Sequence, residues 1–218
     1  MEKKIHLTVD DRELEVPEGD VLLQACLDND IYIPNLCFLK EMKSPSASCR
    51  LCFVEIEGRD RPVTSCTVKV EEGMRVKTDT PEVRRLQKSG LKLLLSVHDI
   101  DCRHCPANKK CALQQIARFL KTGLNAKPLE TILKDEGVDT SHPCLDYYAN
   151  RCVLCGRCVF MCRQQNGQNV LTFARRGFAT IVSSYGGAVD ADESCDDCRA
   201  CVDICPVGAL VLKTATLD

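Results

Sequence analysis

The sequence predicts an α+β chain made of several small domains. Alternating apolar and polar residues, typical of strands, occur at 4–9 and at 13–16, and the final GALVLK segment at 208–213 is also expected to be a strand. Apolar residues at helical spacing lie between these runs, most clearly from 81 to 97. The chain of 218 residues also has 17 cysteines, no tryptophan and only six phenylalanines and four tyrosines. Because ordinary core material is scarce, we expect cysteine-bound groups to replace part of the core.

The first 79 residues are predicted to form a β-grasp-like domain. Strands at 4–9 and 13–16 form a hairpin that turns at Asp10–Asp11, and Asp20 is expected to be the N-cap of a helix that reaches Asn29. Further strands are expected at 51–56 and 74–78. Cys26 lies on the apolar face of the predicted helix, so we interpret it as a buried free thiol rather than a ligand.

Four cysteines in this domain have gaps that suit a [2Fe-2S] cluster: Cys37, Cys49, Cys52 and Cys66. A short CxxC followed by a distant last cysteine is typical of plant-type [2Fe-2S] sites. The first gap is 11 residues here rather than 4, which widens the loop at 38–48.

Residues 80–122 are predicted to form a helical module with a second cluster. Thr80–Pro81 is a helix start, and the helix is expected to reach about Val97 with Gly90 as a weak point. A second helix is expected over 112–120. Cys102, Cys105 and Cys111 lie between the two helices and leave a [4Fe-4S] cluster one ligand short.

Three residues are candidates for the missing ligand: His98, His104 and Cys144. We favour His98 because the end of a helix places it and because it completes His-x3-Cys-x2-Cys-x5-Cys. A neutral imidazole in place of a thiolate removes one negative charge, so such a cluster should be easier to reduce.

The most specific pattern is Cys-x2-Cys-x2-Cys-x3-Cys, which occurs twice in the region 148–218. In such a run three thiolates hold one [4Fe-4S] cluster and the fourth reaches a neighbouring cluster. We therefore predict two crossed ligand sets: Cys152, Cys155, Cys158 and Cys205 for one cluster, and Cys195, Cys198, Cys201 and Cys162 for the other. The alternative is structural zinc, which more often uses two CxxC pairs.

Around these runs the sequence predicts fewer elements. Residues 123–147 form a connection with a short helix at 128–135, in which His142 and Cys144 are expected to be bystanders. A hairpin is expected with strands at 169–173 and 178–182. Asp196 and Asp197 lie between two ligands; either they make that cluster harder to reduce or they are solvated loop residues.

Composition excludes several classes of function. The net charge of −2 gives no nucleic-acid footprint, and no apolar stretch is long enough to span a bilayer. No GxGxxG follows a strand, so no dinucleotide site is expected, and no catalytic residues are predicted. The odd cysteine count, the need for free thiolates and the lack of an apolar signal segment after Met1 favour the cytoplasm.

The ordered set of motifs resembles a known family. The matching pieces are IYIPNLC (31–37), ASCRLCFVEIEG (47–58), HDIDCRHCPANKKCALQ (98–114), SHPCLDYYANRCVLCGRCVFMC (141–162) and CDDCRACVDICPVGAL (195–210). They resemble the N-terminal iron–sulfur region of the large peripheral subunit of NADH:quinone oxidoreductase and of [FeFe]-hydrogenases. The likeness is closest to the diaphorase small subunit of NAD-linked bidirectional hydrogenases. The chain departs from the family at CDDC, where uncharged residues are more usual between the cysteines.

This resemblance implies a fold and a role. The fold is a β-grasp [2Fe-2S] ferredoxin domain, a helical His/Cys3 [4Fe-4S] module and a bacterial-ferredoxin-like 2[4Fe-4S] domain. The role is that of an electron-transfer subunit with one [2Fe-2S] and three [4Fe-4S] clusters, in a complex that is able in principle to bifurcate electrons. The implied partners are a flavin- and NAD(P)-binding subunit and a second redox site, such as a hydrogenase, a formate dehydrogenase, another flavoprotein or ferredoxin. The alternatives are an autonomous enzyme and a metal-stabilised scaffold.

Overall fold

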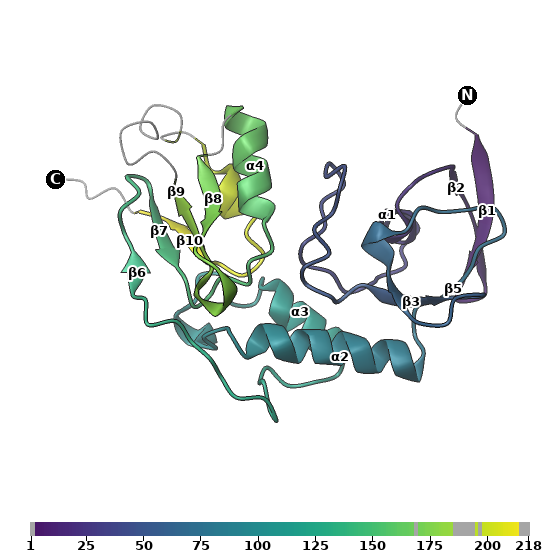
Figure 1. Ribbon diagram of the computed structural model, residues 1–218, viewed down its shortest axis with the longest axis horizontal. Helices are drawn as coiled ribbons and strands as arrows, with labels where there is room; N and C mark the ends of the chain where they lie inside the picture. Colours follow the sequence, from purple (N-terminus) through teal and green to yellow (C-terminus); the bar gives the residue numbers. More distant parts are fainter. Residues whose placement is uncertain (1–2, 168–169, 185–194, 196–197, 214–218) are drawn as a thin grey trace. The chain divides into compact units, whose positions relative to one another are not determined.

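The computed structural model describes residues 3–167, 170–184, 195 and 198–213 (Figure 1). The chain divides into two compact units, Met1–Lys92 with Ile116–Gly123 and Leu93–Gln115 with Leu124–Asp218. Both units mix helices with strands, as the predicted α+β class requires. None of the described helices is long and apolar enough to cross a membrane.

The first unit is built on a five-stranded sheet with the strand order β2-β1-β5-β3-β4. Its elements are β1 (Lys4–Val9), β2 (Arg12–Pro17), α1 (Leu22–Asp28), β3 (Phe53–Ile56), β4 (Val63–Thr64), the 3-10 turn η1 (Ser65–Thr67) and β5 (Arg75–Lys77). β1 and β2 form the predicted antiparallel hairpin, and β5 pairs with β1 in parallel. The parallel pairing brings the C-terminal half of this domain back onto its first strand.

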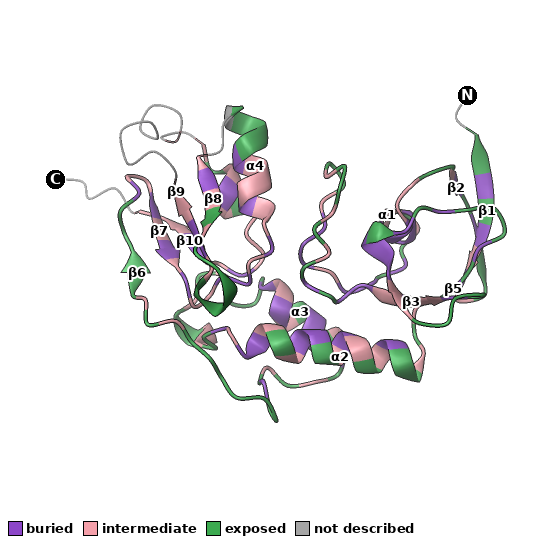
Figure 2. Ribbon diagram, viewed as in Figure 1, coloured by how far each residue is buried: buried purple, intermediate pink, exposed green. Residues whose placement is uncertain are grey.

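Alternation in β1 explains which face of the sheet is covered. Ile5, Leu7 and Val9 are buried, whereas His6 between them is exposed. Figure 2 shows the resulting bands along β1. The inward residues join one apolar cluster with Leu22, Leu23 and Cys26 of α1 and with residues of β3 and β5. As predicted, Cys26 is a buried thiol of this core, with 0% exposure.

The predicted N-cap of α1 is wrong. The helix begins after Val21, and no side chain caps it. The Leu22 N–H donates instead to the Val68 carbonyl at 2.8 Å, and the Asp20 carbonyl accepts the Val70 N–H at 2.9 Å. A neighbouring backbone segment thus replaces the side-chain cap that local sequence suggested.

Two helices connect the units: α2 (Pro81–Leu95) and α3 (Ala112–Phe119). The predicted start of α2 is confirmed, because Thr80 Oγ1 accepts the Val83 N–H at 3.2 Å. Gly90 is not a weak point of this helix but a point of close approach. A Cβ on Gly90 would lie 2.5 Å from the Arg50 carbonyl oxygen, so only glycine lets α2 pack against that backbone.

The second unit contains two small sheets. A three-stranded sheet has the order β10-β7-β6, and a two-stranded hairpin joins β8 to β9. The elements are the 3-10 turn η2 (Cys102–His104), β6 (Val138–Asp139), β7 (Leu145–Tyr148), α4 (Arg157–Asn166), β8 (Leu171–Ala174), η3 (Gly177–Ala179), β9 (Ile181–Ser184), α6 (Ala200–Asp203) and β10 (Leu210–Leu212). The predicted hairpin and final strand are both present, the hairpin shifted by one to three residues.

The short helix predicted at 128–135 is absent, and α4 was not predicted. Backbone groups of the 128–135 segment bond to other parts of the unit rather than to each other. The Ile132 N–H donates to the Ser96 carbonyl at 2.7 Å, and the Lys134 N–H donates to Asn150 Oδ1 at 2.8 Å. These long-range bonds hold the segment in an irregular conformation despite its local helical pattern.

Candidate metal centres

The four cysteines predicted for the first cluster lie together in the first unit. All of them are buried, with at most 5% exposure. The Cys37 and Cys49 sulfurs lie 3.4 Å apart, and the thiols of Cys52 and Cys66 are joined by a hydrogen bond. The structure therefore arranges four sulfurs as two pairs, Cys37 with Cys49 and Cys52 with Cys66.

The acidity of these thiols differs within each pair. The hydrogen bond between the two thiols of each pair lowers the pKa of Cys37 and of Cys52. The same bonds, together with burial, raise the pKa of Cys49 and Cys66. A bound metal would displace the protons of these thiols, because thiolates are the metal-binding form of cysteine.

The loop that carries Cys49 and Cys52 is held by backbone contacts. Arg50 has a left-handed backbone with φ of 52°, and its carbonyl faces Gly90 of α2. The Ser65 N–H and Ser65 hydroxyl both donate to the Cys52 carbonyl at 2.9 Å. These bonds fix the segment of Cys66 next to that of Cys52.

The second unit brings Cys102, Cys105 and Cys111 near one another. Burial raises the pKa of Cys111, and the nearby Cys105 and Cys102 contribute to the increase. The three candidates for a fourth ligand occupy very different surroundings. His104 is exposed, and its Nδ1 lies 2.8 Å from Asp101 Oδ2. Cys144 lies with another group of cysteines.

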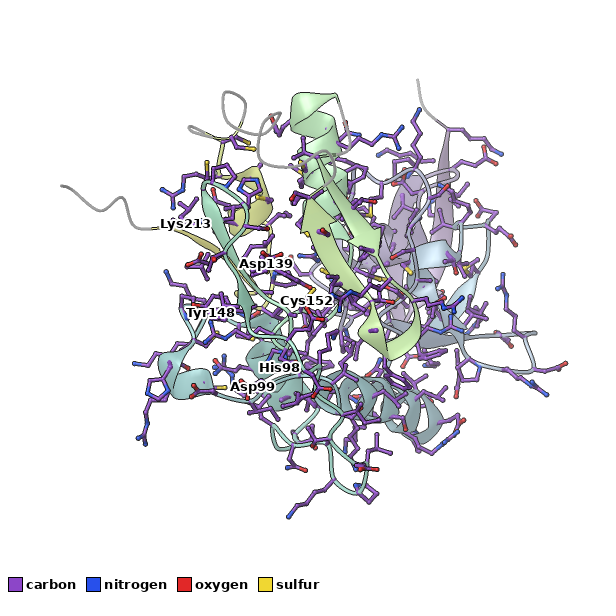
Figure 3. The ribbon with its side chains drawn as sticks, turned by 60° about the vertical axis from the view of Figure 1, so that its left-hand side comes forward. His98, Asp99, Asp139, Tyr148, Cys152 and Lys213 are labelled. Atoms are coloured by element: carbon purple, nitrogen blue, oxygen red, sulfur yellow. The ribbon has the colours of Figure 1, made fainter. Side chains whose placement is uncertain are left out.

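His98 is buried, with 8% exposure, and follows the end of α2 (Figure 3). The Arg151 backbone forms a hydrogen bond with its ring. Its Nδ1 is buried and has no hydrogen-bond partner among the described residues. Burial also lowers the pKa of His98, which favours the neutral ring. A neutral imidazole whose buried Nδ1 has no hydrogen-bond partner among the described residues has the arrangement of a metal ligand.

The eight cysteines of the double run line two separate hollows. Cys152, Cys155, Cys158 and Cys205 line the first hollow, and Cys162, Cys195, Cys198 and Cys201 line the second hollow. The structure thus groups these side chains in the two crossed sets that spacing predicts. Cys158 and Cys162 both lie on α4, one turn apart, so this helix supplies a thiol to each hollow.

Burial makes four of these thiols, those of Cys152, Cys155, Cys158 and Cys201, poor acids without a cation. It raises the pKa of Cys155 and of Cys201 to about 12, and it raises that of Cys158 as well. Some sulfurs accept hydrogen bonds: Leu154 N–H donates to Cys152 Sγ at 3.4 Å, and Ala209 N–H donates to Cys205 Sγ at 3.3 Å. Polypeptide donors aimed at sulfur suit thiolates better than thiols.

Sequence reasoning missed three residues at these hollows. Tyr147 lines the first hollow, whereas His142 and Cys144, which were expected to be bystanders, line the second. The sequence gives one indication that these three residues lie near the hollows, namely that they precede Cys152 by five to ten positions. Asp196 and Asp197 lie outside the described residues. Across the described residues, no three His, Cys, Asp or Glu side chains converge on a single-ion site.

Three family models match consecutive parts of the chain. Residues 2–81 match a 2Fe-2S iron–sulfur cluster binding domain, and residues 87–123 match the NADH–ubiquinone oxidoreductase-G iron–sulfur binding region. Residues 142–211 match the ferredoxin-like domain of NADH–quinone oxidoreductase subunit 3.

Curated relatives match almost the whole chain. NADPH–Fe(3+) oxidoreductase subunit alpha of Geobacter sulfurreducens is 35% identical over 96% of this chain and 24% of its own length. A G-type subunit of the NADH–quinone oxidoreductase of Rhizobium meliloti is 36% identical over 95% of this chain and 24% of its own. NADP-reducing hydrogenase subunit HndD of Solidesulfovibrio fructosivorans is 36% identical over 94% of this chain and 35% of its own. The chain therefore spans only a quarter to a third of these relatives.

A solved structure covers nearly all of the fold. One chain of an NAD+-reducing [NiFe]-hydrogenase in the H2-reduced state superposes with a TM-score of 0.81 and 29% identity, over 97% of this chain and 88% of that one. The matches agree with the resemblance drawn from the motifs. Residues 2–81, 87–123 and 142–211 are thus similar to the iron–sulfur domains found in the G-type subunits of NADH–quinone oxidoreductases.

Proposed function

We propose that the protein is an electron-transfer subunit that passes single electrons through one [2Fe-2S] and three [4Fe-4S] clusters. The observation that carries this proposal is the pair of hollows in the second unit, each lined by four cysteines. The His98 set lies in the same unit, and the Cys105 thiol is 3.7 Å from the carbonyl of Val207, which lines the first hollow. The three sites of this unit are thus neighbours, as a relay requires.

The proposed ligand sets follow the groups of side chains described above. They are Cys37, Cys49, Cys52 and Cys66 for the [2Fe-2S] cluster, and His98, Cys102, Cys105 and Cys111, then Cys152, Cys155, Cys158 and Cys205, then Cys195, Cys198, Cys201 and Cys162 for the [4Fe-4S] clusters. The buried, unpartnered Nδ1 of His98 supports the histidine ligand.

Each cluster, when bound, accepts or donates one electron. The chain's own residues supply thiolates, exclude water by burial and donate hydrogen bonds to sulfur. Because a nicotinamide exchanges two electrons as hydride, a flavin has to stand between it and a one-electron relay. We therefore propose a flavin- and NAD(P)-binding partner on one side, in the cytoplasm.

The second redox partner is a hydrogenase, a formate dehydrogenase, another flavoprotein or ferredoxin. The name of one relative, an NADP-reducing hydrogenase subunit, supports the hydrogenase among these partners. Electron bifurcation in such a complex is compatible with this role.

The test is the content of iron and acid-labile sulfide per chain after anaerobic purification. One [2Fe-2S] and three [4Fe-4S] clusters predict about 14 irons with matching sulfide. About 10 irons on reconstituted protein would mean that one [4Fe-4S] cluster is missing, which would contradict the proposed count. Zinc without sulfide would refute the electron-transfer role.

A second measurement separates a relay from a scaffold. Dithionite should bleach the visible absorbance of the loaded chain, and a flavoprotein donor with NAD(P)H should reduce it, whereas NAD(P)H alone should not. Clusters that no donor reduces would favour the scaffold, and direct reduction by NAD(P)H would favour an autonomous enzyme.

A further inference from the structure

Tyr147 occupies an unusual position beside the first hollow. It lies on β7, paired with Leu210 of β10 and Asp139 of β6. Side chains alternate along this strand, so Tyr147 is buried, with 7% exposure, while its neighbour Tyr148 is more exposed. Tyr147 lines the hollow together with four cysteines, so its side chain lies close to their sulfur atoms.

Hydrogen bonds set the direction of the phenol. Its oxygen accepts the Val182 N–H at 3.1 Å. Its own O–H donates to the Cys152 sulfur. A phenol with an ordinary pKa of about 10 keeps its proton at neutral pH, so Tyr147 remains a donor.

Cys152 therefore accepts from two directions. The Leu154 N–H reaches the same sulfur at 3.4 Å. A peptide donor is fixed by the backbone, but the phenol is a side chain that the sequence can vary without altering the loop. Hydrogen bonds to cluster sulfurs are among the factors that set reduction potentials.

We propose that Tyr147 is a positioning residue that raises the reduction potential of the cluster held by Cys152, Cys155, Cys158 and Cys205. The inference rests on the proposed function, because it requires a [4Fe-4S] cluster in the first hollow. One-electron reduction by an electron from a flavin or a neighbouring cluster adds one negative charge to the cluster and its thiolates. No proton moves. The O–H···S bond is stronger in the reduced state, so it favours that state.

The decisive variant is Tyr147→Phe in the full-length, cluster-loaded chain, with Tyr148→Phe as the matched control. Tyr148 is adjacent on β7, but the Arg151 guanidinium lies 4.0 Å from the centre of its ring (Figure 3 labels Tyr148 and Cys152). EPR-monitored redox titration with dithionite and mediators should show that the equilibrium constant for reduction of one [4Fe-4S] cluster falls by roughly tenfold. For one electron, this corresponds to a reduction potential lower by about 59 mV. The control and the remaining signals should not shift.

A second substitution separates hydrogen bonding from packing. Incorporation of 3-fluorotyrosine at position 147 makes the phenol more acidic and a stronger donor, so the same signal should move to higher potential. This measurement tests the inference even if the Tyr147→Phe chain loses its iron. Unchanged potentials in a fully loaded Tyr147→Phe or in the fluorotyrosine chain would overturn the inference but leave the relay intact. A wild-type chain without iron and sulfide would overturn the proposed function, and this inference with it.

Discussion

Gly90→Ala is the substitution for which the structure reverses an ordinary expectation. In an exposed helix interior, glycine is about 1 kcal/mol less favourable than alanine, so the change should stabilise α2. Here the new Cβ would lie 2.5 Å from the Arg50 carbonyl oxygen and 3.2 Å from its carbonyl carbon. Both atoms belong to backbone, which cannot rotate away. The helix or the cysteine loop must therefore shift.

The magnitude follows from these opposing effects. Overpacking against a rigid neighbour costs up to about 3 kcal/mol. After subtracting a gain of about 1 kcal/mol in helix propensity, the net loss is up to about 2 kcal/mol. In a chain of this size, a loss of about 2 kcal/mol corresponds to a fall of roughly 4–8 °C in the unfolding temperature.

The assay is thermal unfolding of the anaerobic, cluster-loaded chain, with the EPR signal of the [2Fe-2S] cluster as a local readout. Because Arg50 lies between Cys49 and Cys52, its displacement should alter that signal and leave the [4Fe-4S] signals unchanged. The matched control is Ser89→Ala, one residue earlier on an exposed side of α2, which should not lower the unfolding temperature. An unchanged or raised unfolding temperature in Gly90→Ala would refute the reasoning.

Three further predictions concern the cysteines and His98. His98→Ala should lose about four irons, whereas His98→Cys should keep them and lower the potential of that cluster, because a thiolate adds a negative charge; an unchanged or raised potential in a redox titration would contradict this. Burial raises the pKa of Cys26 from 9.0 to about 12, so between these pH values the unfolded chain holds fewer protons than the folded chain and stability falls as pH rises. Alkylation of Cys26 at pH 8 should accordingly require unfolding. If mass spectrometry finds that Cys26 is alkylated at the same rate in the native and the unfolded chain, this prediction is wrong. Removing iron with a chelator should abolish hydrogen-exchange protection in β7 and α4 before β1 and β2, and equal loss in both units would argue against that order.

Local patterns predicted the parts of the structure that local chemistry determines. A cluster fixes the spacing of its own ligands, so the double run was sufficient to predict the two groups of four thiols. Thr80 was recognised as a cap because the bond to the Val83 N–H spans only three residues. The role of Gly90 depends on Arg50, which is 40 positions away in sequence, and no periodicity signals it. The position of Tyr147 at the first hollow likewise depends on a sheet built from β6, β7 and β10.

The two units differ in what fills their interiors, and this difference explains the expected effect of iron removal. In the first unit, the apolar residues of β1, β2 and α1 form a continuous core with those of β3 and β5. In the second unit, two hollows take the place of packed side chains. Five cysteines of the double run are buried around them: Cys152, Cys155, Cys158, Cys162 and Cys201. Apolar side chains such as Val153 and Leu171 also line the hollows, but they and the thiols gain contacts toward the centre of each hollow only when a group is bound there. On the proposed function, cluster binding in the second unit would therefore supply free energy that side-chain packing supplies in the first, so we expect the proposed ligands there also to hold the fold together.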